Sequence, residues 1–233
     1  MVPHYERALI VGAGSGLSAS LARLLAADGL RIGLAARRTD TLDDLARETG
    51  AAVYACDASD ASQVEALFAR IEPALGGPPD VVIYNASARL RGTIDNLDPQ
   101  VVAQSLMITA HGGFLVAQAA ARRMLPARHG AILFTGASAS VKGYAGSSPF
   151  AMGKFTLRGL AQSLSRELQP KGIHVAHVVI DGVIRGEERP EPADAPDSTL
   201  DPNAIARAYR DLLRQYRSAW TSEIELRPWV ERF

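Results

Sequence analysis

Three glycines at alternate positions, Gly12, Gly14 and Gly16, follow a short apolar run near the start of the printed sequence. Glycine adopts positive φ at low cost and has no side chain to keep a pyrophosphate away from the backbone. A helical pattern begins directly afterwards, at Leu17, so the free N–H groups of its first turn would point at a bound phosphate. The order strand, glycine turn and helix predicts a dinucleotide-binding loop that includes Ser15, and it disfavours the alternative of an ordinary turn.

Two arginines, Arg37 and Arg38, end the second apolar run, and the first acid after them is Asp40. An acidic residue at the end of this strand would hydrogen-bond the ribose 2′-hydroxyl of NAD, whereas a guanidinium group suits a 2′-phosphate. We therefore expect NADP(H) rather than NAD(H) as the cofactor. The alternative is that both arginines are solvated surface residues.

Short apolar runs alternate with helical patterns along almost the whole chain. Strands are expected at 8–11, 32–36, 51–55, 80–84, 131–135, 173–180 and 223–226, and helices at 17–28, 40–49, 60–73, 99–124, 148–169 and 203–216. This alternation predicts parallel strands with right-handed crossovers, and continuously apolar strands indicate helices over both faces. The expected fold is α/β, with a single Rossmann-like doubly wound parallel sheet of about seven strands.

Residues 186–202 interrupt the alternation with several prolines and acids, which predicts a mobile loop. Ligands of open α/β sheets bind beyond the carboxyl ends of the strands, so this loop is a candidate lid, or else a disordered insertion without a role. A helix and strand then form the tail of the single domain, residues 1–233, and Trp229 and Phe233 could anchor an oligomer interface.

The chain has 233 residues, a formal net charge of zero and 47% hydrophobic residues. This composition fits one large domain and gives no indication of nucleic acid or an anionic membrane as a partner. Cys56 is the single cysteine, which excludes a disulfide within the chain. No signal peptide and no apolar run of membrane-spanning length are evident, so we expect a cytoplasmic protein. The five histidines lack partners at ligand spacing, and no metal site is expected.

Several motifs recur in a fixed order along the chain. They are Gly12-x-x-x-Gly16-x-Ser18, Cys56-Asp57 after the third expected strand, Tyr84-Asn85-Ala86-Ser87 after the fourth, the helix start Phe150-Ala-Met-Gly-Lys154, and the segment 164–175. Together they resemble the short-chain dehydrogenase/reductase family over nearly the full length. The resemblance implies a Rossmann-type fold and an oxidoreductase that binds a nicotinamide cofactor.

The resemblance also implies which residues contact the cofactor. Asp57 would hydrogen-bond the adenine, and Lys154 would bind the nicotinamide ribose. The full set expected around the nucleotide is Gly12, Gly14, Ser15, Gly16, Leu17, Arg37, Arg38, Asp57, Ala58, Asn85, Ala86, Ser87, Lys154, Gly182, Val183 and Ile184. Family members commonly pair through their two long helices, here 99–124 and 148–169, so a homodimer or homotetramer is expected.

The proton-handling positions depart from the family pattern, which marks the chain as an atypical member. Phe150 stands at the place of the proton-donating tyrosine, four residues before Lys154, and a phenyl ring has no proton to give. The place of the family's serine falls on Ala137, one residue before Ser138. We take Tyr144, on the loop before the Lys154 helix, as the candidate replacement donor and Ser138 as a candidate for orienting the substrate; a surface loop tyrosine is the alternative.

Three functional interpretations follow. The favoured one is NADP(H)-linked interconversion of a carbonyl and an alcohol with a non-standard proton donor, since loss of a general acid costs about 10² to 10⁴ in rate without abolishing the reaction. The others are an inactive nucleotide-binding homologue that acts as a structural or sensing partner, and a non-redox isomerase or lyase on the same scaffold. The small-molecule substrate is not identified. Arg89, Arg91 and Arg185 could favour an anionic one, although exposed arginines are common.

Overall fold

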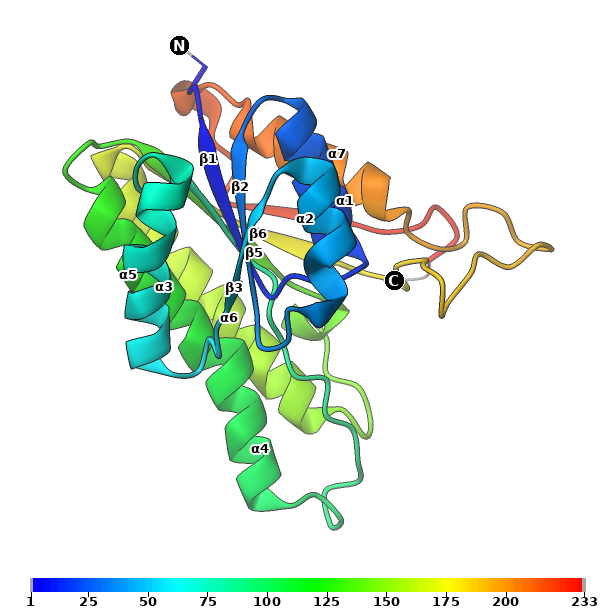
Figure 1. Ribbon diagram of the computed structural model, residues 1–233. Helices are drawn as coiled ribbons and strands as arrows, with labels where there is room; N and C mark the ends of the chain where they lie inside the picture. The colour runs from blue at the N-terminus through cyan, green and yellow to red at the C-terminus, as the bar shows by residue number, and fades with distance from the viewer. Residues whose placement is uncertain (1, 232–233) are drawn as a thin grey trace.

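A seven-stranded sheet in the order β3-β2-β1-β4-β5-β6-β7 forms the centre of the protein, and every neighbouring pair of strands is parallel (Figure 1). The computed structural model describes residues 2–231. The strands are β1 (Arg7–Val11), β2 (Arg31–Ala36), β3 (Ala52–Ala55), β4 (Val81–Tyr84), β5 (Gly130–Thr135), β6 (Ile173–Ile180) and β7 (Glu223–Leu226). The strand order reverses between β1 and β4, which is where doubly wound sheets bind their ligands.

Helices cover both faces of the sheet, as the continuously apolar strands predicted (Figure 1). The helices are α1 (Leu17–Ala27), α2 (Asp43–Thr49), α3 (Ala61–Leu75), α4 (Pro99–Leu106), α5 (Gly112–Met124), α6 (Ser148–Leu168) and α7 (Pro202–Leu213). One core cluster joins α1, α2 and α7 to Ala8 and Ile10 of β1, and the other joins α3, α5 and α6 to Leu9 and Val11. The expected fold class is confirmed.

A five-residue π-helical segment, Met107–His111, joins α4 to α5 without a break. The hydroxyl of Tyr84, at the end of β4, donates a hydrogen bond to the carbonyl oxygen of Ile108 in this segment. The hydroxyl oxygen of Thr109 accepts a 3.0 Å hydrogen bond from the Ala88 N–H. The π segment therefore anchors the loop that follows β4, close to the reversal of strand order.

The combined helix Pro99–Met124 corrects one expectation. By length and composition, with a mean hydropathy of 1.2 over 18 residues, it is long and apolar enough to cross a membrane, whereas no such run was expected. Its apolar character also has a structural use, because Val116, Ala117 and Ala120 of α5 pack into the core cluster on β4 and β5. Small side chains on this face let the helix lie close to the sheet.

The chain after β6 differs in detail from the expectation. The helix expected over 203–216 ends at Leu213, because Gln215 turns to pair with both the N–H and the hydroxyl of Thr221. The loop expected over 186–202 ends where α7 begins, and a parallel bridge joins Ile184 to Leu200 at its base. Trp229 is 80% exposed, and Phe233 lies outside the described residues.

Candidate nucleotide and substrate site

The glycine loop between β1 and α1 lies at the carboxyl end of the central strand. Gly12 has φ +87°, and a Cβ atom there would lie 2.3 Å from the Ala86 nitrogen, so no other residue fits. A Cβ at Gly14 or Gly16 would meet no protein atom within 4 Å. These two glycines therefore face open space. The first turn of α1 has no side-chain cap, and among the described residues the N–H groups of Leu17 and Ser18 have no hydrogen-bond acceptor, so they are available to a ligand.

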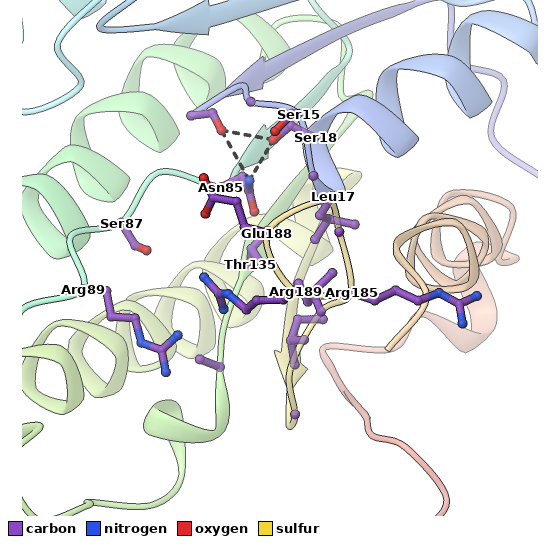
Figure 2. A pocket seen from close by; sticks show the side chains of 18 of the residues that line it. Ser15, Leu17, Ser18, Asn85, Ser87, Arg89, Thr135, Arg185, Glu188 and Arg189 are labelled. Carbon is purple, nitrogen blue, oxygen red and sulfur yellow. Dashed lines mark hydrogen bonds between the residues drawn. The ribbon is translucent and has the colours of Figure 1, made fainter. Parts of the chain in front are cut away.

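Asn85 holds this loop against the end of β4. Its side-chain amide donates to the Ser18 hydroxyl oxygen at 2.7 Å and to the Gly12 carbonyl oxygen at 3.3 Å. The Ser18 hydroxyl donates in turn to the same carbonyl at 3.0 Å (Figure 2). Serine at the third position of the glycine motif thus fixes the shape of the loop, while the side at Gly14 and Gly16 stays open.

A cavity of about 470 Å³ opens at the carboxyl ends of the strands. It brings together many residues expected to contact the cofactor, namely Gly12, Gly14, Ser15, Gly16, Leu17, Asn85, Ser87, Lys154, Gly182 and Ile184. Others do not line it: Arg37, Arg38, Asp57, Ala58, Ala86 and Val183. The expected adenine end therefore lies outside the enclosed part of the site.

Arg37 and Asp57 lie near one another at the ends of β2 and β3. The hydroxyl and N–H of Ser59 both donate to the Asp57 carboxylate, at 2.7 and 2.9 Å. These hydrogen bonds lower the pKa of Asp57, and the positive charge of Arg37 acts in the same direction. Asp57 is therefore an ionised acceptor near an arginine, as the sequence expectation for the adenosine end requires.

Lys154 lies deep in the cavity, with 3% of its surface exposed. Its ammonium group donates a 2.7 Å hydrogen bond to the Thr135 carbonyl oxygen at the end of β5. Burial lowers the pKa of Lys154 from its ordinary 10.5 to about 8. Phe150 lines the same cavity one helical turn earlier, with its ring centre 5.9 Å from the Lys154 nitrogen. Lys154 therefore gives up its proton more readily than an ordinary lysine, and it lies beside an apolar ring.

The two other residues expected to act in catalysis lie elsewhere. Ser138 begins a single 3₁₀ turn, and Ala137 lines the cavity in its place. Tyr144 is 47% exposed and does not line the cavity. The structure therefore brings Lys154 and Phe150 together but leaves both Ser138 and Tyr144 outside the cavity wall.

A buried chain of polar groups beneath the cavity has no counterpart in the sequence analysis. His177 on β6 lies 3.3 Å from the Ser140 hydroxyl through Nε2 and 3.1 Å from the Glu223 carboxylate of β7 through Nδ1. Arg158 of α6 donates to both oxygens of Glu223, at 2.8 and 2.7 Å. Burial lowers the pKa of His177 to about 4, so the ring is neutral at pH 7. The only signal in the sequence that could have indicated this chain of polar groups was the presence of histidine in the apolar run that forms β6.

Residues 185–189, which follow β6, form another part of the cavity wall. The backbones of Gly186 and Arg189 exchange two 3.0 Å hydrogen bonds, which close a tight turn over the cavity. Glu187, Glu188 and Arg189 of this turn line the cavity together with Arg185. The loop expected as a candidate lid therefore contributes its first residues to the site.

Residues 6–188 match the model of the short chain dehydrogenase family. The chain belongs to this family. Among curated proteins, this chain is 30% identical over 190 residues to short chain aldehyde dehydrogenase 1 of Euphorbia lathyris. That alignment covers 76% of this chain and 63% of the Euphorbia protein.

Solved structures extend the likeness to the whole fold of this chain. A crystal structure of a short-chain dehydrogenase from Rhodopseudomonas palustris aligns with a TM-score of 0.83 at 34% identity, over 97% of this chain and 100% of that one. A metagenomic short-chain oxidoreductase in complex with NADP aligns with a TM-score of 0.84 at 25% identity, over 98% of this chain and 99% of that one. The membership of an oxidoreductase family expected from the motifs is confirmed.

Proposed function

We propose that this short chain dehydrogenase is an NADP(H)-dependent oxidoreductase that interconverts a carbonyl compound and an alcohol. One observation carries the proposal: the open face of the glycine loop and the buried ammonium group of Lys154 line the same cavity. A bound nicotinamide cofactor would supply or accept the hydride.

The residues of the chain fit such a cofactor. The free N–H groups of the first turn of α1 and the bare backbone at Gly14 and Gly16 suit a pyrophosphate. Lys154 would donate to ribose hydroxyls, and the Asp57 carboxylate would accept from the adenine. The exposed guanidinium groups of Arg37 and Arg38 suit a 2′-phosphate, which favours NADP(H) over NAD(H).

Lys154 is the best-placed proton source in the cavity. With a pKa of about 8 it is mostly protonated at pH 7 but gives up its proton more readily than an ordinary lysine. A water held between its ammonium group and the substrate would pass this proton to the developing alkoxide. Tyr144, the donor expected from the sequence, would need its loop to move over the cavity.

Phe150 favours a second candidate function, which is nucleotide binding without turnover. The side chain lines the reaction end of the cavity and offers no proton. A protein of this kind would use the nucleotide as a structural or sensing ligand. The two candidates share the cofactor site and differ in whether NADPH is oxidised when a carbonyl compound is present.

Titration with NADPH and NADH tests the proposal, with thermal shift and cofactor fluorescence as readouts. We expect NADPH to bind about tenfold or more tightly than NADH, because a guanidinium group pairs with the 2′-phosphate. Arg37→Ala should remove most of that preference and leave NADH binding unchanged, whereas Arg47→Ala, on the exposed side of α2, should change neither. If neither nucleotide raises the melting temperature, the proposed cofactor site is wrong.

We also infer self-association through the two long helices. Met107 and Phe114, on the helix formed by α4 and α5, and Met152 and Phe155 of α6 are between 42% and 50% exposed. Apolar side chains of this size at the surface favour a protein interface. Light scattering should give the mass of a homodimer or homotetramer, and Phe114→Glu combined with Phe155→Glu should give the monomer. We further infer a cytoplasmic location, where the free thiol of Cys56 would stay reduced.

A further inference from the structure

Two arginines from distant segments reach the reaction end of the cavity. Arg89, on the loop after β4, places its guanidinium carbon 5.8 Å from the ring centre of Phe150. Arg189, in the turn after β6, lines the same cavity. Figure 2 shows the Arg189 side chain directed toward that of Arg89, from the opposite wall. The loop after β4 and the loop after β6 thus bring two positive charges to one place.

Neither arginine is neutralised by an ion pair among the described residues. Arg185 is different, because it pairs with Glu191 at 2.7 Å and with Asp201 at 3.0 Å and points away from Arg89 (Figure 2). Glu187 and Glu188 also line the cavity, but the described residues show no ion pair between them and either arginine. Figure 2 shows the Glu188 side chain directed toward Asn85 at the glycine loop. Arg185, which the sequence suggested for an anionic substrate, is therefore occupied, whereas Arg89 and Arg189 are not.

Positive charges gather around Arg89. Partial burial, followed by the positive charges of Arg91 and Arg189, lowers the pKa of Arg89. Like charges held close together at a protein surface cost free energy, and a bound anion removes that cost. Two of these arginines, Arg89 and Arg189, line the cavity together with Phe150.

We propose that the substrate is an oxo acid or the corresponding hydroxy acid, whose carboxylate is bound by Arg89 and Arg189. Guanidinium groups match a carboxylate through paired N–H···O hydrogen bonds. The Phe150 ring offers an apolar surface for the carbon skeleton between the carboxylate and the reacting carbon. This inference rests on the proposed function for the identity of the reacting group, but the anion site can be measured without it.

The test compares acids with their neutral esters. Isothermal titration would use benzoylformate, pyruvate and 2-oxohexanoate, each against its methyl ester, with and without NADP⁺. We expect the acids to bind and the esters to bind at least about tenfold more weakly, because the esters lack the charge. Arg89→Gln and Arg189→Gln should each weaken binding of the acids by about tenfold or more and leave binding of the esters unchanged.

Arg207→Gln is the matched control, since Arg207 is exposed on α7 and does not line the cavity. Arg89→Lys, which keeps the charge but loses the paired geometry, should fall between the wild type and Arg89→Gln. The proposal is overturned if the wild type binds acids and esters with equal affinity. It is also overturned if Arg89→Gln weakens the binding of acids and of esters by the same factor. A third outcome separates the two proposals. If the protein binds the acids through Arg89 but binds no nucleotide, the anion site is supported and the proposed function is refuted. Competition by inorganic phosphate stronger than by any acid would assign the site to phosphate esters instead and overturn the carboxylate.

Discussion

The ammonium nitrogen of Lys154 lies 5.9 Å from the centre of the Phe150 ring, within the range of a cation–π contact. The ring thus lies beside the positive charge but carries no group that could exchange a proton with it. A hydroxyl at the far end of this ring would be a general acid whose pKa the lysine lowers. A tyrosine at position 150 would therefore lie beside the lysine.

Phe150→Tyr should therefore accelerate hydride transfer in the presence of NADPH. A positioned general acid contributes about 10² to 10⁴ in rate, so we expect a gain toward the lower end of that range. Single-turnover oxidation of NADPH with a reactive carbonyl compound measures it. The matched control is Phe155→Tyr on the exposed side of the same helix. Equal rates for the two variants would mean that the reaction needs no acid at position 150.

Lys154→Met should change how stability depends on pH. The folded protein holds the ammonium with a pKa of about 8, below the ordinary 10.5, so the unfolded chain binds more protons between these values. The unfolding free energy of the wild type should rise relative to that of the variant as pH increases from 8 to 10.5. At pH values below 8 the wild type should carry the full free-energy cost of burying the charge. At about 1.4 kcal/mol for each unit of pKa difference, the total is about 3 kcal/mol.

Urea unfolding of the wild type and of Lys154→Met across this pH range measures the difference. Lys171→Met provides the control, because Lys171 is exposed at the end of the chain segment that leads into β6. Above pH 8, we expect the unfolding free energy of Lys154→Met to change less with pH than that of the wild type. A parallel pair of curves would show that Lys154 titrates normally.

Two glycine substitutions should separate folding from nucleotide binding. Gly12→Ala would combine φ +87° with a Cβ 2.3 Å from the Ala86 nitrogen, so we expect a loss of several kcal/mol in unfolding free energy. Gly14→Ala meets no protein atom within 4 Å and should leave the melting temperature nearly unchanged. It should nevertheless weaken NADPH binding, since its methyl group fills the space for the phosphates. Tight NADPH binding by Gly14→Ala would place the nucleotide elsewhere.

His177→Gln should make the protein less sensitive to acid. The pKa of His177 is lowered by burial from 6.5 to about 4, with Lys154 and Arg158 acting in the same direction and Glu223 against them. The unfolded chain therefore binds more protons between pH 6.5 and 4, and wild-type stability falls as pH decreases through that range, by up to about 3 kcal/mol. Glu223, whose pKa is lowered mainly by Arg158, adds to the loss at lower pH in both proteins.

The measurement is the unfolding free energy at several pH values between 4 and 7, with His111→Gln, at an exposed position, as the control. The wild type and the control should lose stability in parallel, and His177→Gln should lose less. A steeper loss in His177→Gln than in the wild type would show that the histidine is charged in the folded state.

The sequence by itself determined the sheet, the helices on both faces and the glycine loop that lines the cavity. Each depends on a local pattern: apolar runs for the strands, a repeat of apolar residues for the helices, and glycines where the backbone must stay bare. The bounds of β6 and β7 were correct to the residue, because each run of apolar or alternating side chains has its ends marked by turn residues. Gly14, Asn85 and Lys154 meet because parallel strands end at the same edge of a sheet.

Only the tertiary structure decided which polar side chains meet across long separations in the chain. Arg89 and Arg189 are a hundred positions apart and come together through two loops whose paths no local pattern specifies. His177 finds Ser140 and Glu223 because neighbouring strands and one 3₁₀ turn place them in contact. Tyr144 is near Lys154 in the sequence but lies outside the cavity. The spacing of apolar residues in the sequence indicates which face of a helix or strand is buried. Which charged side chains pair depends on distances between elements, and these are set only when the elements pack together.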